Sequence, residues 1–286
     1  MAEIPALTVV KLRKMSGQGM MDCKKALEEA EGDVEKAMGL LRKKGLATLA
    51  KRTERETTEG AVVSKAGPGR KEVAMASLCC ETDFAANSDA FISAAESLAD
   101  CTLVCPAEQG VGNLLETIVN GKKYNDILTE AVSKTGEKMQ VEDYIRYKLD
   151  GPGVIGVYIH FNKKVGTMVH IATGSDGEAA AMQQTAVDIA MHITAAKPMA
   201  LDKDGVNPEV IEKEKEIAAA QIKNKPADIV AKIVEGKMKK FFADNCLLEQ
   251  QFVKDDSKTI RQFLSEAAKQ AGGTANIKRF ARFEVG

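Results

Sequence analysis

The sequence predicts an α+β protein built from several subdomains. Three observations support this class: small apolar residues recur at helical spacing in residues 1–55, a strand hairpin followed by a helix appears twice, and two charged helices are joined by a very short connection. A chain of 286 residues can bury more than one hydrophobic core. We expect five segments, with boundaries at 1–55, 56–138, 139–208, 209–245 and 246–286.

The first segment, residues 1–55, is expected to form a compact bundle of three helices, the third of which ends at Gly45. Short helices with such small apolar stripes resemble a ubiquitin-associated bundle. Met20 and Met21 lie in the turn before the second helix. The sequence leaves two interpretations open: at least one Met fills the core, or the pair forms an adaptable surface that binds another protein.

The two core segments share one order of predicted elements. Residues 61–63 and 73–80 flank a Gly-Pro-Gly turn, and a helix is expected at 90–104. Residues 153–160 and 165–172 flank a second turn, and a single helix is expected at 178–195. The recurrence predicts two related subdomains, with the strand at 140–148 assigned to the second and residues 246–286 returning to it.

The stretch Cys80 to Asn87 connects the strand and the helix of the first copy. It places Thr82, Asp83 and Phe84 on a loop between rigid elements, where a side chain can be held out to a partner. In the alternative interpretation, Asp83 caps a turn and Phe84 folds back into the core. The corresponding loop of the second copy, residues 173–177, has no aromatic residue, which favours a function for Phe84.

Residues 209–223 and 226–244 are predicted to form an antiparallel helical hairpin, a coiled-coil arm. The connection consists of Asn224 and Lys225, so the two helices must face each other. Such an arm is either a structural element or a surface for interaction.

Composition and motifs argue against several classes of function. The net charge of −1 is not that of an electrostatic nucleic-acid binder, and no apolar run approaches the roughly 18–20 residues of a membrane span. Lys11, Arg13 and Lys14 interrupt any signal-peptide core, so a cytoplasmic protein with reduced cysteines is expected. Cys101 and Cys105 lack a second ligand pair, so no metal is expected.

Motifs for enzymatic chemistry are missing from the sequence. It contains no phosphate-binding loop, no dinucleotide fingerprint and no zinc-protease motif, and His160 and His170 have no nucleophile pattern beside them. We therefore expect neither a cofactor nor covalent catalysis.

Six separated motifs, in order along nearly the whole chain, resemble the elongation factor Ts family: MMDCKKALEEAEGD, CETDFAAN, DIAMHITAAKP, KIVEGKMKKFF, QQFVKDDSKT and RFEVG. The resemblance implies a guanine nucleotide exchange factor whose partner is elongation factor Tu, the GTPase that carries aminoacyl-tRNA. It implies no direct contact with nucleic acid or membrane. The arm is linked in the family to dimerisation or partner contact, which would allow a homodimer or a two-plus-two complex.

The resemblance also implies roles for particular residues. The family's intrusive loop, which enters the partner near its magnesium and phosphate site and helps dislodge the ion, corresponds to Thr82, Asp83, Phe84 and Ala85. The family's apolar N-terminal pair corresponds to Met20 and Met21, which would contact the nucleotide domain of the GTPase. The second subdomain would contact a more distant domain of the partner.

The sequence departs from the family pattern at two positions of this loop and at its end. Ala85 stands where Val is usual, and Asn87 where Lys is usual. Many relatives continue beyond the position of Gly286 into a helix that adds a contact, so that contact is not carried over. The competing hypothesis is a non-catalytic adaptor that binds partners through its N-terminal bundle.

Overall fold

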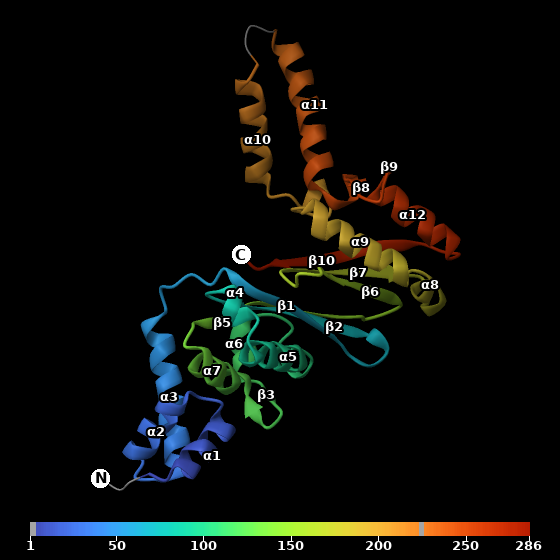
Figure 1. Ribbon diagram of the computed structural model, residues 1–286. Helices are drawn as coiled ribbons and strands as arrows, with labels where there is room; N and C mark the ends of the chain where they lie inside the picture. The colour runs from blue at the N-terminus through green and yellow to red at the C-terminus, as the bar shows by residue number, and fades with distance from the viewer. Residues whose placement is uncertain (1–3, 223–225) are drawn as a thin grey trace.

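The computed structural model describes residues 4–222 and 226–286 (Figure 1). The N-terminal bundle consists of α1 (Ala6–Ser16), α2 (Met20–Glu29) and α3 (Val34–Lys51). Its small core is formed by buried residues from all three helices: Val9, Leu12, Cys23, Ala26, Leu27, Ala30, Ala37 and Leu41. The bundle lies at one end of the elongated molecule and contacts the rest mainly through α3, with the turn at Gly17 beside Lys134 of α7 (Tyr124–Thr135) as a second contact.

The prediction that Gly45 ends the third helix is wrong, because α3 continues to Lys51. A Cβ atom at Gly45 would lie 2.7 Å from the carbonyl oxygen of Thr129 in α7 (Tyr124–Thr135). The glycine therefore permits close packing of two helices rather than a left-handed cap.

The first sheet has the antiparallel order β1-β2-β5, formed by β1 (Glu59–Ala66), β2 (Glu72–Cys80) and β5 (Met139–Lys148). The assignment of residues 140–148 to the second subdomain is thus corrected, because β5 pairs with β2 from Glu72↔Lys148 to Cys80↔Met139. One face of this sheet is covered by α5 (Asp89–Val104) and α7. Shorter elements complete this half: η1 (Pro68–Arg70), α4 (Asp83–Ala86), α6 (Val111–Glu116), β3 (Ile118–Val119) and β4 (Lys122–Lys123).

The second sheet repeats this topology with the order β10-β7-β6, formed by β6 (Gly153–Ile159), β7 (Val165–Thr173) and β10 (Ala275–Glu284). The single helix predicted at 178–195 is two helices, α8 (Asp176–Ala181) and α9 (Gln183–Ala196), separated at Met182, whose side chain is buried in the core. The remaining elements are η2 (Lys203–Gly205), η3 (Leu247–Glu249), β8 (Gln251–Phe252), β9 (Asp255–Thr259) and α12 (Ile260–Gln270).

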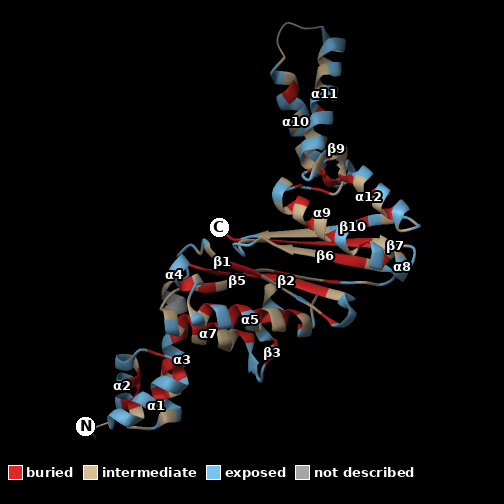
Figure 2. Ribbon diagram, turned by 45° about the vertical axis from the view of Figure 1, so that its right-hand side comes forward, coloured by how far each residue is buried: buried red, intermediate tan, exposed pale blue. Residues whose placement is uncertain are grey.

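The two sheets pack face to face, with helices on both outer faces (Figures 1 and 2). Apolar side chains from both sheets fill the layer between them, among them Val62, Met75, Tyr147, Ile155 and Met168. Separate cores lie between each sheet and its helices. The N-terminal bundle and the helical arm project from this four-layer packing.

The helices α10 (Pro208–Ala220) and α11 (Ala227–Asn245) project from the second half as an antiparallel pair (Figure 1). The predicted connection, Asn224 and Lys225, lies outside the described residues. At the base of the arm, the buried Gln250 side chain donates to the carbonyl oxygens of Ala196 and Asp244 and accepts from Nε2 of His192. These bonds join α9, α11 and the segment after it.

Candidate partner-binding site

Phe84 is one of the most exposed large apolar side chains in the described part of the chain, at 85% of its full accessibility. It lies on α4, a helix of one turn between the buried strand β2 and the long helix α5. The interpretation in which Phe84 folds into its own core is therefore wrong. Leaving an apolar phenyl ring in water forgoes the free energy of burying it, so the exposed Phe84 is a candidate for contact with another molecule.

The turn that carries Phe84 is held by a set of short-range hydrogen bonds. Thr82 caps α4, since its Oγ1 accepts from the backbone N–H of Ala85 at 3.2 Å. Asp83 accepts from the N–H of Phe84 at 3.0 Å, and Asn87 donates from its side chain to the carbonyl oxygen of Asp83 at 2.8 Å. The capping residue is thus Thr82 and not Asp83.

The four residues of the predicted loop divide into two groups. Asp83 and Phe84 are exposed, whereas Ala85 is only 4% exposed and belongs to the core beneath the first sheet. Thr82 is half-buried, and its hydroxyl is occupied by hydrogen bonds within the chain. Only Asp83 and Phe84 are presented to the outside.

Glu81, which precedes this turn, is fixed by an ionic network. Both of its carboxylate oxygens accept from Arg52, at 2.7 and 2.9 Å, and one also accepts from Arg55 at 2.8 Å and the other from the backbone N–H of Lys138 at 2.7 Å. Burial disfavours the charged carboxylate, but these hydrogen bonds outweigh it and lower the pKa of Glu81 to about 2. The network ties the segment after α3 to the base of α4.

Met20 and Met21 are 42% and 62% exposed in the first turn of α2, which begins two residues before the expected cap Asp22. Neither belongs to the core of the bundle. The alternative that one of them fills the core is therefore wrong, and the pair is available for contact.

Phe161 is a second exposed aromatic residue, which sequence reasoning missed. It is 87% exposed at the turn between β6 and β7, and its ring lies 4.5 Å from that of His160. A groove of about 650 Å³ separates this turn from α4 and α5, and Asp83, Ile92 and Phe161 are among its lining residues. No local pattern marks Phe161, because aromatic residues in hairpin turns do not follow a period.

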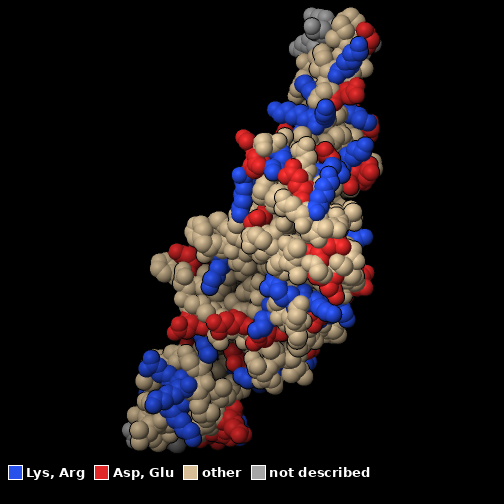
Figure 3. Space-filling model, turned by 90° about the vertical axis from the view of Figure 1, so that its right-hand side faces the viewer, with Lys and Arg blue, Asp and Glu red and all other residues tan. Residues whose placement is uncertain are grey.

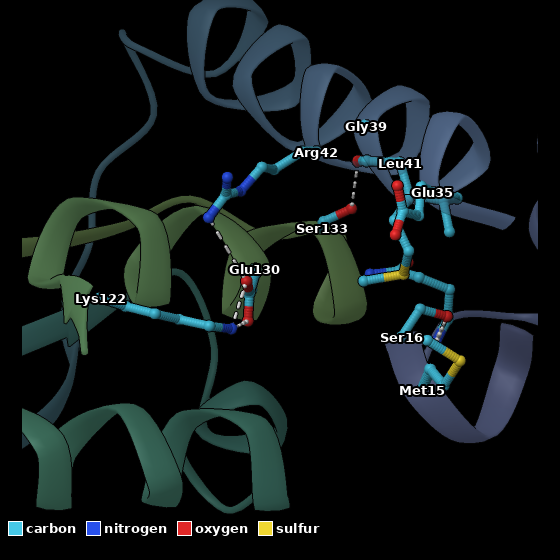
Figure 4. Close-up of a pocket in the computed structure, with 11 residues that line it drawn as sticks. Met15, Ser16, Glu35, Gly39, Leu41, Arg42, Lys122, Glu130 and Ser133 are labelled. Atoms are coloured by element: carbon cyan, nitrogen blue, oxygen red, sulfur yellow. Dashed lines mark hydrogen bonds and ion pairs between the residues drawn. The ribbon is translucent and has the colours of Figure 1, made fainter. Parts of the chain in front are cut away.

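A second cleft, of about 380 Å³, lies where the N-terminal bundle meets α7 (Figure 4). Arg42 and Lys122 approach Glu130 from opposite sides, and the Ser133 hydroxyl donates to the carbonyl oxygen of Leu41 at 3.1 Å. Because Arg42, Lys122 and Glu130 pair with one another and the Ser133 hydroxyl bonds across to α3, we interpret this cleft as a seam between two parts of the protein.

The histidines and cysteines form no reactive cluster in residues 4–222 and 226–286. His170 pairs with Ile155, far along the hairpin from His160, and Cys101 and Cys105 are buried and free. Within those residues, no group of three or more His, Cys, Asp or Glu could hold a metal ion. No helix among them is long and apolar enough to cross a membrane.

Charged side chains are distributed unevenly over the face shown in Figure 3. Lys and Arg gather on the N-terminal bundle, while both signs alternate along the arm formed by α10 and α11. Alternating charge is typical of a solvent-exposed helix surface. The two exposed aromatic residues, Phe84 and Phe161, lie apart from these charged surfaces, on α4 and on the turn between β6 and β7.

Comparison with known proteins identifies the family. The family model "Elongation factor TS" matches residues 81–286. The elongation factor Ts of a Nitratiruptor species is 41% identical over 285 residues, which cover 99% of this chain and 93% of that protein. Those of Nautilia profundicola and Chlorobium phaeobacteroides are 42% and 38% identical, over 100% of this chain and 94% and 100% of theirs. The chain belongs to the elongation factor Ts family.

Proposed function

We propose that this protein is the guanine nucleotide exchange factor of elongation factor Tu, and that α4 is its intrusive element. The observation that carries the proposal is Phe84, 85% exposed on a braced turn in a member of the elongation factor Ts family. The protein performs no covalent chemistry. It binds the GDP-loaded GTPase, disrupts its magnesium and phosphate site, and releases GDP so that GTP can bind.

Exchange follows from linkage between two binding events. A GTPase holds its nucleotide through a phosphate-binding loop and a magnesium ion. A factor that binds the nucleotide-free form more tightly than the loaded form must weaken nucleotide binding by the same ratio. The phenyl ring of Phe84 would supply this preference, because its burial between helices of the partner shifts elements that support the magnesium site.

The exposed and the buried residues of the α4 turn have different proposed roles. Phe84 is the wedge, and Asp83 perturbs polar groups around the magnesium ion through charge and hydrogen bonds. Thr82 and Ala85 hold the turn from within, so we assign them support rather than contact. On this assignment, Ala85 in place of the usual Val alters core packing, and Asn87 in place of Lys closes α4.

Other exposed apolar residues extend the proposed interface. Met20 and Met21 would add contacts to the nucleotide domain of the GTPase, and Phe161 would add one from the second half.

On the arm, Ile217 and Ile229 are 41% and 40% exposed, which suits packing against a partner or a second copy. Light scattering of the protein alone and with the GTPase would separate these two uses of the arm.

The release of fluorescent GDP from elongation factor Tu tests the proposal. Addition of this protein at catalytic concentration should accelerate release in proportion to its concentration. Binding to elongation factor Tu without acceleration would refute exchange and support the adaptor hypothesis.

A further inference from the structure

The capping residue of α4 is held by a carboxylate from a distant part of the chain. The backbone N–H of Thr82 donates to Oε2 of Glu137 at 3.1 Å, and its hydroxyl donates to Oε1 of the same residue at 2.8 Å, over a separation of 55 residues. Glu137 follows Gly136, the left-handed residue that ends α7. The turn that presents Phe84 is therefore fastened to the junction of α7 and β5.

In the second half of the molecule, the capping residue of the short helix is held by a carboxylate close to it in sequence. Ser175 caps α8, and its hydroxyl donates at 3.0 Å to Glu178, three residues later in the same helix. The N–H of Gly174 donates to the other oxygen of Glu178 at 3.0 Å. This is a self-contained arrangement that resembles a capping box.

The first half cannot use a local carboxylate because of its packing. The position equivalent to Glu178 is Ala85, which is buried against the core. The two carboxylates on either side of Thr82 in sequence have other partners. Glu81 accepts from Arg52, Arg55 and Lys138, and Oδ1 of Asp83 accepts from the N–H of Phe84. Glu137 is the carboxylate that remains for Thr82.

We infer that Glu137 is a positioning residue for the exchange reaction, which fixes the direction in which Phe84 points; this inference rests on the proposed function. An aromatic side chain on a pre-ordered turn binds without the entropy cost of ordering that turn. The bidentate contact restrains both the backbone and the side chain of Thr82, and through the cap it restrains the whole of α4.

Two matched substitutions separate positioning from plain stability. Glu137→Ala and Glu178→Ala each remove one capping carboxylate, from the first and second half respectively, so similar losses of melting temperature are expected. Glu137→Ala should lower the apparent second-order rate constant of GDP release about five- to tenfold, while Glu178→Ala leaves it unchanged. Glu137→Gln keeps one acceptor oxygen and should lie between wild type and Glu137→Ala.

A double substitution tests whether Glu137 acts through Phe84. Added to Phe84→Ala, the Glu137→Ala change should cause no further loss of exchange, because the side chain that it positions is gone. Hydrogen exchange at the amides of residues 82–86 should accelerate in Glu137→Ala. Multiplicative losses, unchanged exchange in Glu137→Ala, or equal losses in Glu178→Ala would overturn the inference. If Phe84→Ala itself left exchange unchanged, the proposed function of α4 would fail instead.

Discussion

The two halves of the molecule share one backbone arrangement after the strand hairpin, but they carry different side chains on it. In each, a strand hairpin ends at a hydroxyl residue, Thr82 or Ser175, that caps a helix of one or two turns before a long helix begins. The short helix of the first half carries Phe84 at the position where the second half has Gly177. The fold is therefore built without an aromatic residue at this place, so the ring of Phe84 serves a purpose other than folding.

The largest expected effect on GDP release comes from removing the aromatic ring that distinguishes the first half from the second. Truncation of a central aromatic contact typically costs about 2–4 kcal/mol, so Phe84→Ala should lower the efficiency of GDP release roughly 30-fold to several hundred-fold. Gly177→Ala, in the second half, should leave exchange unchanged. Circular dichroism should show both variants folded, because Phe84 belongs to no core and a Cβ atom at Gly177 would meet only Oγ of Ser175, at 3.9 Å.

The second prediction concerns how the first half holds the N-terminal bundle. Gly45→Val would drive its side chain into Thr129, 2.7 Å from the Cβ position, and should destabilise the protein by about 1–3 kcal/mol. Gly39 lies in the same helix with nothing within 4 Å of its Cβ position, so Gly39→Ala should stabilise the protein by about 0.5–1 kcal/mol. Thermal unfolding measures both; equal effects would contradict the packing role of Gly45.

A smaller effect is expected at the methionine pair. Replacing both Met20 and Met21 with Ala should raise the concentration for half-maximal exchange about tenfold, for a loss of about 1.4 kcal/mol. The maximal rate should stay the same, because these residues contribute affinity and not the wedge. A reduced maximal rate with unchanged affinity would contradict this assignment, because the methionine pair would then act as Phe84 does.

The smallest effect is a difference in acid sensitivity between the halves. His192 in the second half is buried and hydrogen-bonded to Gln250, and burial lowers its pKa below 6.5. The neutral imidazole therefore contributes its full stability above pH 6.5. This contribution is lost as the pH falls from 6.5 through the lowered pKa of the folded state. Glu81 in the first half keeps its contribution until the pH falls from 4.5 towards about 2. Glu81→Gln should lower the melting temperature at pH 7 by about 2–4 °C. It should also remove the loss of stability between pH 4.5 and about 2, while the loss below pH 6.5 remains.

Local patterns predicted much of this fold. Hairpins, caps and helical stripes depend on residues close in sequence, and the contrast between Phe84 and the aromatic-free second loop was visible without coordinates. Several of the errors involve distant partners. Gly45 has the signature of a helix end, but its role depends on Thr129 in another helix.

Long-range strand pairing and remote hydrogen bonds could not be predicted from the sequence either. The strand β5 follows the first half's helices and returns to β2, a pairing that its own alternation does not encode. The bond between Thr82 and Glu137 spans 55 residues and has no signature at either end. Exposed positions such as Phe161 follow no period, so only the packed chain reveals them.

Photocrosslinking from position 84 tests the central claim most directly. Benzoylphenylalanine at this position, in complex with nucleotide-free elongation factor Tu, should form an adduct within the nucleotide domain beside the magnesium and phosphate site. The same probe at position 177 should form none there. Adducts from position 84 confined to this chain itself, or to a part of the GTPase remote from its nucleotide, would contradict the account.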